Sequence, residues 1–351
     1  MSEKSDIVFV CDGSAPGGIG RYARGLGGEL LRQPAGRLRP SILDTSLGPG
    51  GRRVIRPLRR VYREQVGTAR ELTSARLVHL ADYRPVVPSH RAFVLTVHDV
   101  FFLTRPDWYP RPIRLYKKAL LHVALRKHPA AVICVSQATR EALVAAVPGF
   151  AGIRLEVIHP GVEPPRSPAE ATPAGDTYFV TVGTIEPRRN HLALLEAFRR
   201  ARGEGLQARW RVVGGVGYHG APIADELRAA DGVDVVTGAT DEELDATYRG
   251  ALFAVTPSLG EGFGFPPLEA MARGVPVICP AGGVFDETVG DAGVRVAGSA
   301  DSWTDALLHL GHRADERSRY AAAGARQAGT FSWDRAAAAT TRLYEEILGV
   351  A

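Results

Sequence analysis

Two glutamates stand eight positions apart on either side of an apolar, glycine-rich run. Glu261 opens the segment and Glu269 closes it, and between them lie Gly262, Phe263, Gly264, Phe265, Pro266, Pro267 and Leu268. Glycine lets a backbone approach a ligand closely, and a proline suits the first turn of a helix, which we expect to begin at Pro267. The two carboxylates would then contact different parts of one ligand, with a sugar at Glu261 in the loop and a ribose diol at Glu269 in the first turn of the helix.

A pair of arginines, Arg188 and Arg189, follows the short apolar run 178–182 and precedes Asn190 and a helical segment. Guanidinium groups are permanently charged and donate hydrogen bonds in forks, a geometry that matches phosphate oxygens. Beside the N-terminus of a helix, such a pair predicts a clamp for a diphosphate. The alternative is an arginine pair on the surface that binds no ligand.

A glycine-rich turn that contains Gly17, Gly18 and Gly20 follows the first apolar run of the chain. A turn of this kind at the start of a helix presents backbone N–H groups and the positive end of the helix dipole, which suits a phosphate. The spacing is not the G-x-G-x-x-G of dinucleotide-binding proteins, although Asp44 stands roughly where their ribose-binding acid would be. A Rossmann oxidoreductase therefore stays open as an alternative, as does a tight turn without a ligand.

His98 and Asp99 come directly after another apolar run, 93–97. A histidine at the end of a strand can form a hydrogen bond with a sugar hydroxyl or position a reacting group, and Asp99 is placed to orient its ring. A histidine with a purely structural role is the alternative.

The elements that must position these residues follow one pattern. Short β-branched apolar runs alternate with helical segments in both halves of the chain, which is typical of parallel sheets built from strand–helix–strand units. A proline-rich segment, 160–175, lies between the halves. We therefore expect an α/β protein with two Rossmann-like, doubly wound domains, 1–164 and 165–351, whose strand ends face a central cleft. The tail, 302–350, is predicted to be helical, and its last helix is able to pack back on the first domain.

The charge of the chain is asymmetric. Residues 1–164 contain 25 Lys and Arg against 13 Asp and Glu, residues 165–351 contain 18 against 25, and the two balances of +12 and −7 give the net charge of +5. The first half is therefore expected to face an anionic partner. Its stretch Arg52–Arg63 interleaves arginines with apolar residues, as a helix on an anionic membrane surface does, and a solvated helix explains it equally well. Nucleic acid is not expected, because the arginines are not interspersed with stacking aromatic residues.

Several classes of protein are disfavoured by what the sequence lacks. No apolar run is long enough to span a membrane, and the N-terminus is polar, so we expect a cytoplasmic protein, with peripheral attachment at the inner membrane face as an option. The three cysteines are widely spaced and predict neither disulfides nor a zinc site. Because Asp-x-Asp, P-loop and His-Glu-x-x-His motifs are absent, we expect no metal ion and no other cofactor.

Taken together and in this order, these residues resemble the retaining, two-domain glycosyltransferases of family 4, which have the GT-B fold. The resemblance extends over essentially the whole chain, and the segment from Glu261 to Glu269 is its most specific part. Thr96–Asp99 together with Glu186–Asn190 is similar to the bacterial mannosyltransferase branch. The resemblance implies that a hexose, α-mannose from GDP-mannose in the first place or a sugar from a UDP-hexose, is transferred to a glycan, lipid-linked or small-molecule acceptor. It also implies retention at the anomeric carbon, without a metal ion or a dedicated protein base.

The same resemblance implies roles for individual residues, with the donor mainly on the second domain and the acceptor on the first. Arg188 and Arg189 would neutralise the leaving phosphates, and Glu269 would bind the ribose diol. His98 would lie near the transferred sugar. The remaining donor-binding residues are the diphosphate-facing Gly17, Gly18 and Gly20, the sugar-binding Glu261, Phe263 and Gly264, and Asn190 and Gly262 in the same segments. Arg189 and Val216 stand where the family usually or often has Lys, which leaves the identity of the donor open.

Two other functions remain open. One is the nicotinamide-dependent oxidoreductase already mentioned, against which the broken glycine spacing argues. The other is a partner protein that binds a nucleotide sugar without catalysis and recruits another protein.

Overall fold

The computed structural model describes residues 6–15, 17–32, 38–45, 72, 75–83, 92–150, 152–165 and 177–350. Its internal contacts divide the chain into two units, residues 1–161 with 332–351 and residues 162–331. The boundary predicted after residue 164 lies in the same connecting segment, and the last helix of the chain belongs to the first unit. The stretch Arg52–Arg63 lies outside the described residues.

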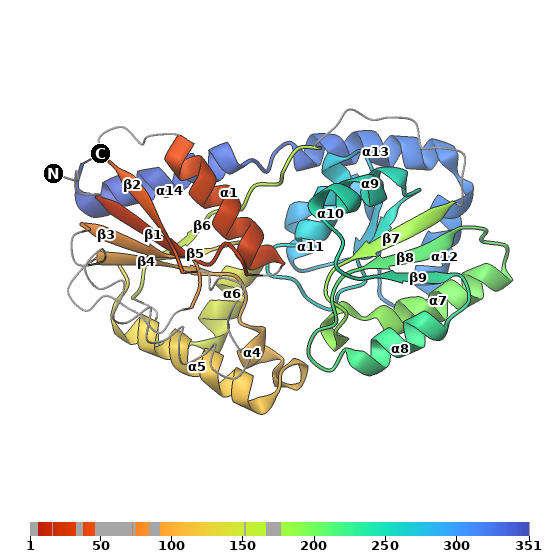
Figure 1. The fold of residues 1–351 in the computed structure, drawn as a ribbon, viewed down its shortest axis with the longest axis horizontal. Helices are drawn as coiled ribbons and strands as arrows, with labels where there is room; N and C mark the ends of the chain where they lie inside the picture. The colour runs from red at the N-terminus through yellow and green to blue at the C-terminus, as the bar shows by residue number, and fades with distance from the viewer. Residues whose placement is uncertain are drawn as a thin grey trace. The chain divides into compact units, whose positions relative to one another are not determined.

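The first unit contains a sheet of six described strands, all parallel, in the order β2-β1-β3-β4-β5-β6 (Figure 1). The strands are β1 (Ile7–Cys11), β2 (Pro40–Asp44), β3 (Leu77–Leu80), β4 (Ala92–Val97), β5 (Ala131–Cys134) and β6 (Leu155–Val157). Its described helices are α1 (Gly18–Arg32), α4 (Phe101–Thr104), α5 (Arg111–Arg126), α6 (Gln137–Ala146) and α14 (Trp333–Leu348), with the 3₁₀ turns η2 (Pro106–Trp108) and η3 (Pro148–Phe150). Because β2 lies on one side of β1 and β3 on the other, the strand order reverses between β1 and β3.

The strands of the first sheet send alternate side chains to two helical layers, as the two-residue period of a strand requires. Val8 and Val10 of β1 share a core with Leu121 of α5, whereas Phe9 packs on the other face against the ring of His79. Figure 1 shows α5 on one side of this sheet and α1 and α14 on the other. Both faces of the sheet are thus covered, which explains why its strands are nearly continuous apolar runs.

A buried chain of hydrogen bonds attaches α14 to the first sheet. The hydroxyl of Tyr344 in α14 contacts Nδ1 of His79 in β3, and Nε2 of His79 lies 2.7 Å from Oγ1 of Thr96 in β4. The hydroxyl of Tyr22 in α1 lies 3.0 Å from the same Oγ1. Burial lowers the pKa of His79 to about 3, so its ring is neutral and offers one donor and one acceptor. Tyr344 and Thr96 satisfy both ring nitrogens, and the end of the chain is thereby fixed to the first unit.

The second unit also contains six described strands, all parallel, in the order β12-β11-β10-β7-β8-β9. The strands are β7 (Tyr178–Val182), β8 (Arg209–Val213), β9 (Val233–Val236), β10 (Ala254–Val255), β11 (Val277–Pro280) and β12 (Val294–Val296). The helices and 3₁₀ turns are η4 (Pro187–Arg189), α7 (His191–Gly203), α8 (Ala221–Ala229), α9 (Asp241–Gly250), α10 (Phe265–Ala272), α11 (Val284–Thr288), η5 (Gly290–Ala292), α12 (Ala300–His312) and α13 (Ala314–Ala328). The strand order reverses between β7 and β10, which is the strand order of dinucleotide-binding sheets. Among the described residues of the chain, no helix combines the length and apolar character that crossing a membrane requires.

Aromatic side chains fill the core of the second unit. Phe179 of β7 stacks on Trp210 of β8 and on Phe253, with ring centroids 5.8 and 5.3 Å apart. The indole N–H of Trp210 donates to Oγ1 of Thr181 at 3.0 Å, which satisfies the one polar atom that the ring carries into the core.

His191, the first residue of α7, is buried near Trp210 in a stacked arrangement. Neither of its ring nitrogens has a hydrogen-bond partner among the described residues. Burial and, to a smaller extent, the charge of Arg189 lower the pKa of His191 to about 3. The ring is therefore neutral in the folded protein and becomes protonated near pH 6.5 once the chain unfolds.

We expect this histidine to make the protein less stable in mild acid. Below about pH 6.5 the unfolded state binds a proton that the folded state excludes, so the free energy of unfolding falls by about 1.4 kcal/mol per pH unit down to about pH 3. His191→Phe keeps an aromatic ring beside Trp210 and removes this term. The free energy of unfolding of both proteins is measured by chemical denaturation between about pH 7 and pH 4. Below about pH 6.5, the difference in favour of the variant should grow by about 1.4 kcal/mol per pH unit. Parallel pH profiles would contradict the assignment of a neutral, buried ring.

Candidate active site

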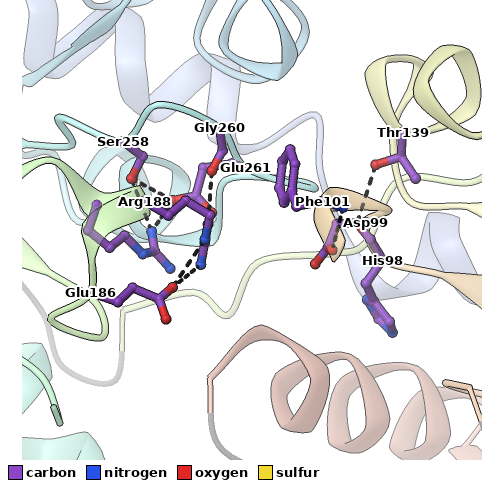
Figure 2. Close-up of polar contacts among 10 residues, drawn as sticks. His98, Asp99, Phe101, Thr139, Glu186, Arg188, Ser258, Gly260 and Glu261 are labelled. Atoms are coloured by element: carbon purple, nitrogen blue, oxygen red, sulfur yellow. Dashed lines mark hydrogen bonds and ion pairs between the residues drawn. The ribbon is translucent and has the colours of Figure 1, made fainter. Parts of the chain in front are cut away.

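The strand reversal of the second sheet brings two loops together. The loop after β7 leads through Gly183 and the turn η4 into α7, and the loop after β10 leads through Ser258 and Glu261 into α10. Ligands of doubly wound sheets bind beyond the carboxyl ends of the strands, at the point where the strand order reverses. Arg188 from the first loop and Glu261 from the second meet at this point (Figure 2), and Arg189 joins them.

Arg188 connects the two loops through its guanidinium group. Its Nε and Nη2 donate to Oε1 of Glu186 at 3.1 and 2.7 Å. Its Nη1 donates to the carbonyl oxygen of Gly260 at 2.8 Å and to Oε2 of Glu261 at 3.1 Å. A fork held by acceptors on both sides has little freedom to rotate, so the place of its positive charge is set by the protein rather than by a ligand.

Arg189 pairs with the other carboxylate oxygen of Glu261. Its Nη1 donates to Oε1 of Glu261 and, at 3.3 Å, to Oγ of Ser258, whose own hydroxyl donates to the same Oε1 at 2.9 Å. The guanidinium lies against Gly183, which has a φ of +142° and where an added Cβ would stand 3.1 Å from Cζ of Arg189. Glycine at this position therefore allows the loop after β7 to pass close to the arginine.

The charged side chains of this cluster, Glu186, Arg188, Arg189 and Glu261, sum to zero. A diphosphate must therefore compete with carboxylates for the guanidinium N–H groups, and the N-termini of α7 and α10 are the further positive ends at the same sheet edge. The sequence predicted that Glu261 holds sugar hydroxyls. In the structure both of its carboxylate oxygens accept hydrogen bonds from the arginines, so a sugar hydroxyl must share or exchange one of these contacts.

The second glutamate of the motif lies deeper in α10 than the sequence predicted. The helix begins at Phe265, two residues before Pro267, so Glu269 lies beyond its first turn. Gly264 precedes the helix with a φ of 85°, a left-handed conformation that favours glycine. Glu269 is buried, and the hydroxyl of Tyr248 donates to its Oε2 at 3.2 Å. A carboxylate has about four lone-pair sites, so Glu269 is able to accept hydrogen bonds from a ribose diol as well.

Phe263 serves mainly to pack the loop. Its side chain is buried, and its ring meets Phe265 and Phe331 edge to face, with centroids 5.1 and 5.7 Å apart. A contact between Phe263 and a sugar hydroxyl would therefore have to come from the backbone. Gly262 and Gly264, on either side of it, give that backbone its access to a ligand.

The predicted phosphate-binding glycines of the first unit lie where the loop after β1 enters α1. Gly17 has a φ of +69°, and a Cβ added to Gly20 would stand 1.9 Å from the carbonyl oxygen of Ala15. Each of these two glycines thus has a conformational or packing reason that needs no ligand. Gly18 begins α1, whose first turn contains no acidic side chain, so the positive end of this helix stays suitable for an anion.

His98 lies at the carboxyl end of β4, as the sequence predicted, but Asp99 does not orient its ring. The carboxylate of Asp99 accepts from the backbone N–H of Phe101 at 3.2 Å, whereas Nε2 of His98 donates to the carbonyl oxygen of Ala81 at 2.8 Å. Figure 2 shows the two side chains pointing in different directions. The ring also meets Tyr22 edge to face, with centroids 4.9 Å apart.

The protonation state of His98 limits what it can do. Burial lowers the pKa of His98 below its usual value of 6.5, although the nearby Asp82 opposes this shift. The ring is therefore neutral at pH 7, and its Nε2–H donates a hydrogen bond to the carbonyl oxygen of Ala81. Nδ1 is left as a hydrogen-bond acceptor, which suits a sugar hydroxyl and does not suit a general acid.

The structure brings some predicted residues together and leaves others apart. Arg188, Arg189 and Glu261 form one hydrogen-bonded cluster, and Asn190 adjoins it in a left-handed conformation with a φ of 55°. Glu269 lies on α10, at the end of the loop that carries Glu261, and pairs instead with Tyr248. The glycines before α1 and His98 belong to the first unit.

Sequence reasoning gave no role to three residues that contact the predicted ones. Glu186 and Ser258 follow β7 and β10, so the strand-end rule that selected the arginines could have found them as well. Tyr248 lies in α9, and no local pattern links it to Glu269. Within the described part of the chain, no group of three or more His, Cys, Asp or Glu side chains is arranged to hold a metal ion.

Comparison with protein families matches both halves of the chain. Residues 164–327 match the family described as glycosyl transferases group 1, and residues 16–166 match glycosyltransferase family 4. O-antigen chain mannosyltransferase B of Escherichia coli is 30% identical over 268 residues, which cover 72% of this chain and 70% of the relative. D-inositol 3-phosphate glycosyltransferase of Mycobacterium tuberculosis is 30% identical over 213 residues, 56% of this chain and 43% of the relative.

Solved structures share the fold over nearly the whole chain. Sucrose-phosphate synthase from Thermosynechococcus elongatus superposes with a TM-score of 0.73 at 20% identity and covers 98% of this chain and 99% of its own. The Anabaena protein HepE in complex with UDP and glucose gives a TM-score of 0.73 at 17% identity, with 97% and 100% covered. These similarities, with the two parallel, doubly wound sheets, confirm the GT-B fold. The chain belongs to glycosyltransferase family 4 and is a transferase that uses a nucleotide-sugar donor.

Proposed function

We propose that this glycosyltransferase transfers the α-mannosyl group of GDP-mannose, with retention and without a metal ion, to a glycan or lipid-linked acceptor. The observation that carries the proposal is the cluster of Arg188, Arg189 and Glu261 at the strand reversal of the second sheet. The cluster places two permanent positive charges where an α/β sheet binds its ligand. These charges are suited to a diphosphate that leaves with an additional negative charge.

The chemistry asked of these residues is charge stabilisation. In a retaining transfer the bond from the anomeric carbon to the β-phosphate oxygen breaks, and a bond to the acceptor oxygen forms on the same face of the sugar. The acceptor's proton passes to the leaving phosphate. Arg188 and Arg189 would stabilise the growing charge on that phosphate, Glu269 would hold the ribose diol, and Glu261 the sugar hydroxyls. On the first unit, Nδ1 of His98 would accept a hydrogen bond from a sugar hydroxyl.

The choice of mannose rests on similarity. The Escherichia coli relative is named a mannosyltransferase, and the combination of Thr96–Asp99 with Glu186–Asn190 resembles the mannosyltransferase branch. A UDP-hexose is the competing donor, since HepE has been solved with UDP and with UDP-glucose. Arg189 in place of the usual Lys keeps the positive charge that either diphosphate requires.

A panel of donors tests the proposal. Purified full-length protein is incubated with GDP-mannose, UDP-glucose and UDP-N-acetylglucosamine, each with EDTA and with added magnesium, and release of the nucleotide is followed. We expect GDP release from GDP-mannose to exceed release from the UDP-sugars by about tenfold or more. We also expect EDTA to leave the rate unchanged. Faster release from a UDP-sugar would replace the proposed donor, and activity that depends on magnesium would contradict the metal-free mechanism.

A further inference from the structure

The imidazole of His98 is held by three neighbours within the first unit. Its Nε2 donates to the carbonyl oxygen of Ala81 at 2.8 Å, and the hydroxyl of Thr139 donates to the backbone carbonyl oxygen of His98 at 3.2 Å (Figure 2). The ring of Tyr22 in α1 meets the imidazole edge to face, with centroids 4.9 Å apart and planes at 87°. The contact with Ala81 comes from the backbone, whereas the contact with Tyr22 comes from a side chain and is removed by substitution.

Tyr22 is itself fixed in place. Its side chain is 1% exposed, and its hydroxyl lies 3.0 Å from Oγ1 of Thr96 in β4. Thr96 and His98 are two residues apart, so their side chains point to the same face of the sheet. Tyr22 therefore contacts both of them, with its hydroxyl on Thr96 and its ring on His98.

The groups on the far side of Thr96 bring no charge close to His98. Oγ1 of Thr96 also contacts the neutral ring of His79, which in turn contacts the hydroxyl of Tyr344. Burial raises the pKa of Tyr22 well above its usual value, so its hydroxyl stays protonated. Tyr22 thus covers the His98 ring with an uncharged aromatic surface that buried hydrogen bonds hold in position.

The neutral state of His98 depends on this cover. Burial lowers the pKa of His98 below 6.5 and outweighs the charges around the ring. Asp82, which follows β3, and Asp99 favour the protonated ring, whereas Lys117 of α5 disfavours it. If water reached the imidazole, the two carboxylates would therefore favour its protonation, and Nδ1 would become a donor. Tyr22 is one of the side chains that keep water away.

We propose that Tyr22 is a positioning residue for the transfer. Its ring holds the imidazole of His98 in one orientation and excludes water from it, so that Nδ1 remains an acceptor for a sugar hydroxyl. Because Tyr22 is buried, it acts through His98 rather than on the substrate. The inference rests on the role of His98 in the proposed function and adds a residue of α1 to it.

Titration of the His98 ring by NMR tests the cover without any substrate. The histidine rings of the full-length protein are isotope-labelled, and His98→Gln assigns the signal. We expect a pKa below 6.5 for the wild type and for Tyr22→Phe, which keeps the aromatic ring. Tyr22→Leu should raise the pKa of His98 to about 6.5 or above, because water then reaches the imidazole while Asp82 and Asp99 stay in place.

Tyr344→Leu is the matched control for this titration. It removes another buried tyrosine ring of the same hydrogen-bonded chain, but one that packs on His79, with centroids 5.7 Å apart. His98 should titrate in this variant as it does in the wild type. A general loosening of the first unit would instead change the titration in Tyr344→Leu and in Tyr22→Leu alike and would contradict a specific role of Tyr22.

The dependence of kcat on pH tests the consequence for the reaction. With the preferred donor at about pH 8, Tyr22→Leu should lower kcat about tenfold, because the imidazole is no longer held in one orientation. Tyr22→Phe should lower it much less. At about pH 6, Tyr22→Leu should lose a further factor of about four relative to the wild type, since a group with a pKa of about 6.5 is then only about one-quarter neutral. A loss of packing alone would lower kcat equally at both pH values.

A double variant shows whether Tyr22 acts through His98. Tyr22→Leu with His98→Gln should be no slower than His98→Gln alone, because no imidazole is left to position. A further loss in the double variant would overturn the proposal. If Tyr22→Leu does not fold, Tyr22→Met takes its place, since the flexible methionine side chain fills irregular gaps in a core.

The outcomes separate this inference from the proposed function. A wild-type pKa of His98 at or above 6.5, which needs no variant of Tyr22, or an unchanged pKa in Tyr22→Leu would overturn the inference alone. A raised pKa without the expected change in kcat would remove His98 from the reaction and the role of Tyr22 with it. A donor other than GDP-mannose would leave every expectation for Tyr22 unchanged.

Discussion

Replacing Arg188 with Ala is expected to lower kcat by about 10²- to 10³-fold, with a much smaller change in the affinity for the donor. The guanidinium is held by Glu186, Gly260 and Glu261, so its charge is in place before the leaving phosphate develops additional charge. An interaction that strengthens in the transition state affects turnover more than ground-state binding. Steady-state kinetics with the preferred donor and acceptor, read as kcat and KM separately, measure this effect.

A double variant shows how much of the loss comes from the released carboxylate. Arg188→Ala also leaves Glu186 without its salt bridge to Arg188, and a negative charge near the site repels a diphosphate. Arg188→Ala with Glu186→Gln should restore part of the donor affinity and little of kcat. Arg228→Ala, an exposed arginine of α8, is the control for loss of one positive charge. If kcat is instead unchanged and KM rises by about 10²- to 10³-fold, Arg188 contributes to binding alone.

Replacing Glu269 with Ala is expected to weaken binding of the donor nucleotide by about 100-fold. A hydrogen bond to a charged group contributes about 1.5–3 kcal/mol, and a carboxylate on a ribose diol forms two of them. Calorimetric titration with GDP and with UDP measures the loss. Tyr248→Phe is the matched control, because it removes the hydroxyl that donates to Oε2 of Glu269 and keeps the carboxylate. It should weaken binding much less.

A modified nucleotide tests whether the loss is local to the ribose. The 2′-deoxy form of the preferred nucleotide lacks one of the two hydroxyls, so it should bind the wild type more weakly and should be less sensitive to Glu269→Ala. If the variant weakens the deoxy and the ordinary nucleotide by the same factor, Glu269 acts on the fold of α10 rather than on the ribose.

The sequence predicted the parts of the site that follow from strand ends. Residues after an apolar run must lie at the carboxyl edge of a parallel sheet, so Arg188, Arg189 and His98 were found by position together with chemical type. β7 has the limits of the apolar run 178–182 from which it was predicted, and the GT-B fold is confirmed. In contrast, β6 and β12 have only three residues each, too few for the alternation of apolar side chains to identify them.

The remaining features of the site depend on contacts between distant residues. Glu261 pairs with both arginines because β7 and β10 are neighbours in the sheet. The spacing of residues along the chain does not predict which strands are neighbours. The carboxylate of Asp99 could accept a hydrogen bond either from the backbone N–H of Phe101 or from the imidazole of His98. It accepts from Phe101, and Nε2 of His98 donates to the carbonyl oxygen of Ala81 instead. Tyr248 reaches Glu269 from a different helix, which no local pattern predicts.

Calorimetric titration in the presence of EDTA is the most direct test of the proposed diphosphate site. GDP, or UDP if the donor panel so indicates, is titrated into the wild type and into the variant that combines Arg188→Ala with Arg189→Ala. We expect heat of binding for the wild type without any divalent ion and affinity at least about 100-fold weaker for the variant. Equal affinity of the two proteins, or binding that appears only after magnesium is added, would contradict a diphosphate site built from these arginines.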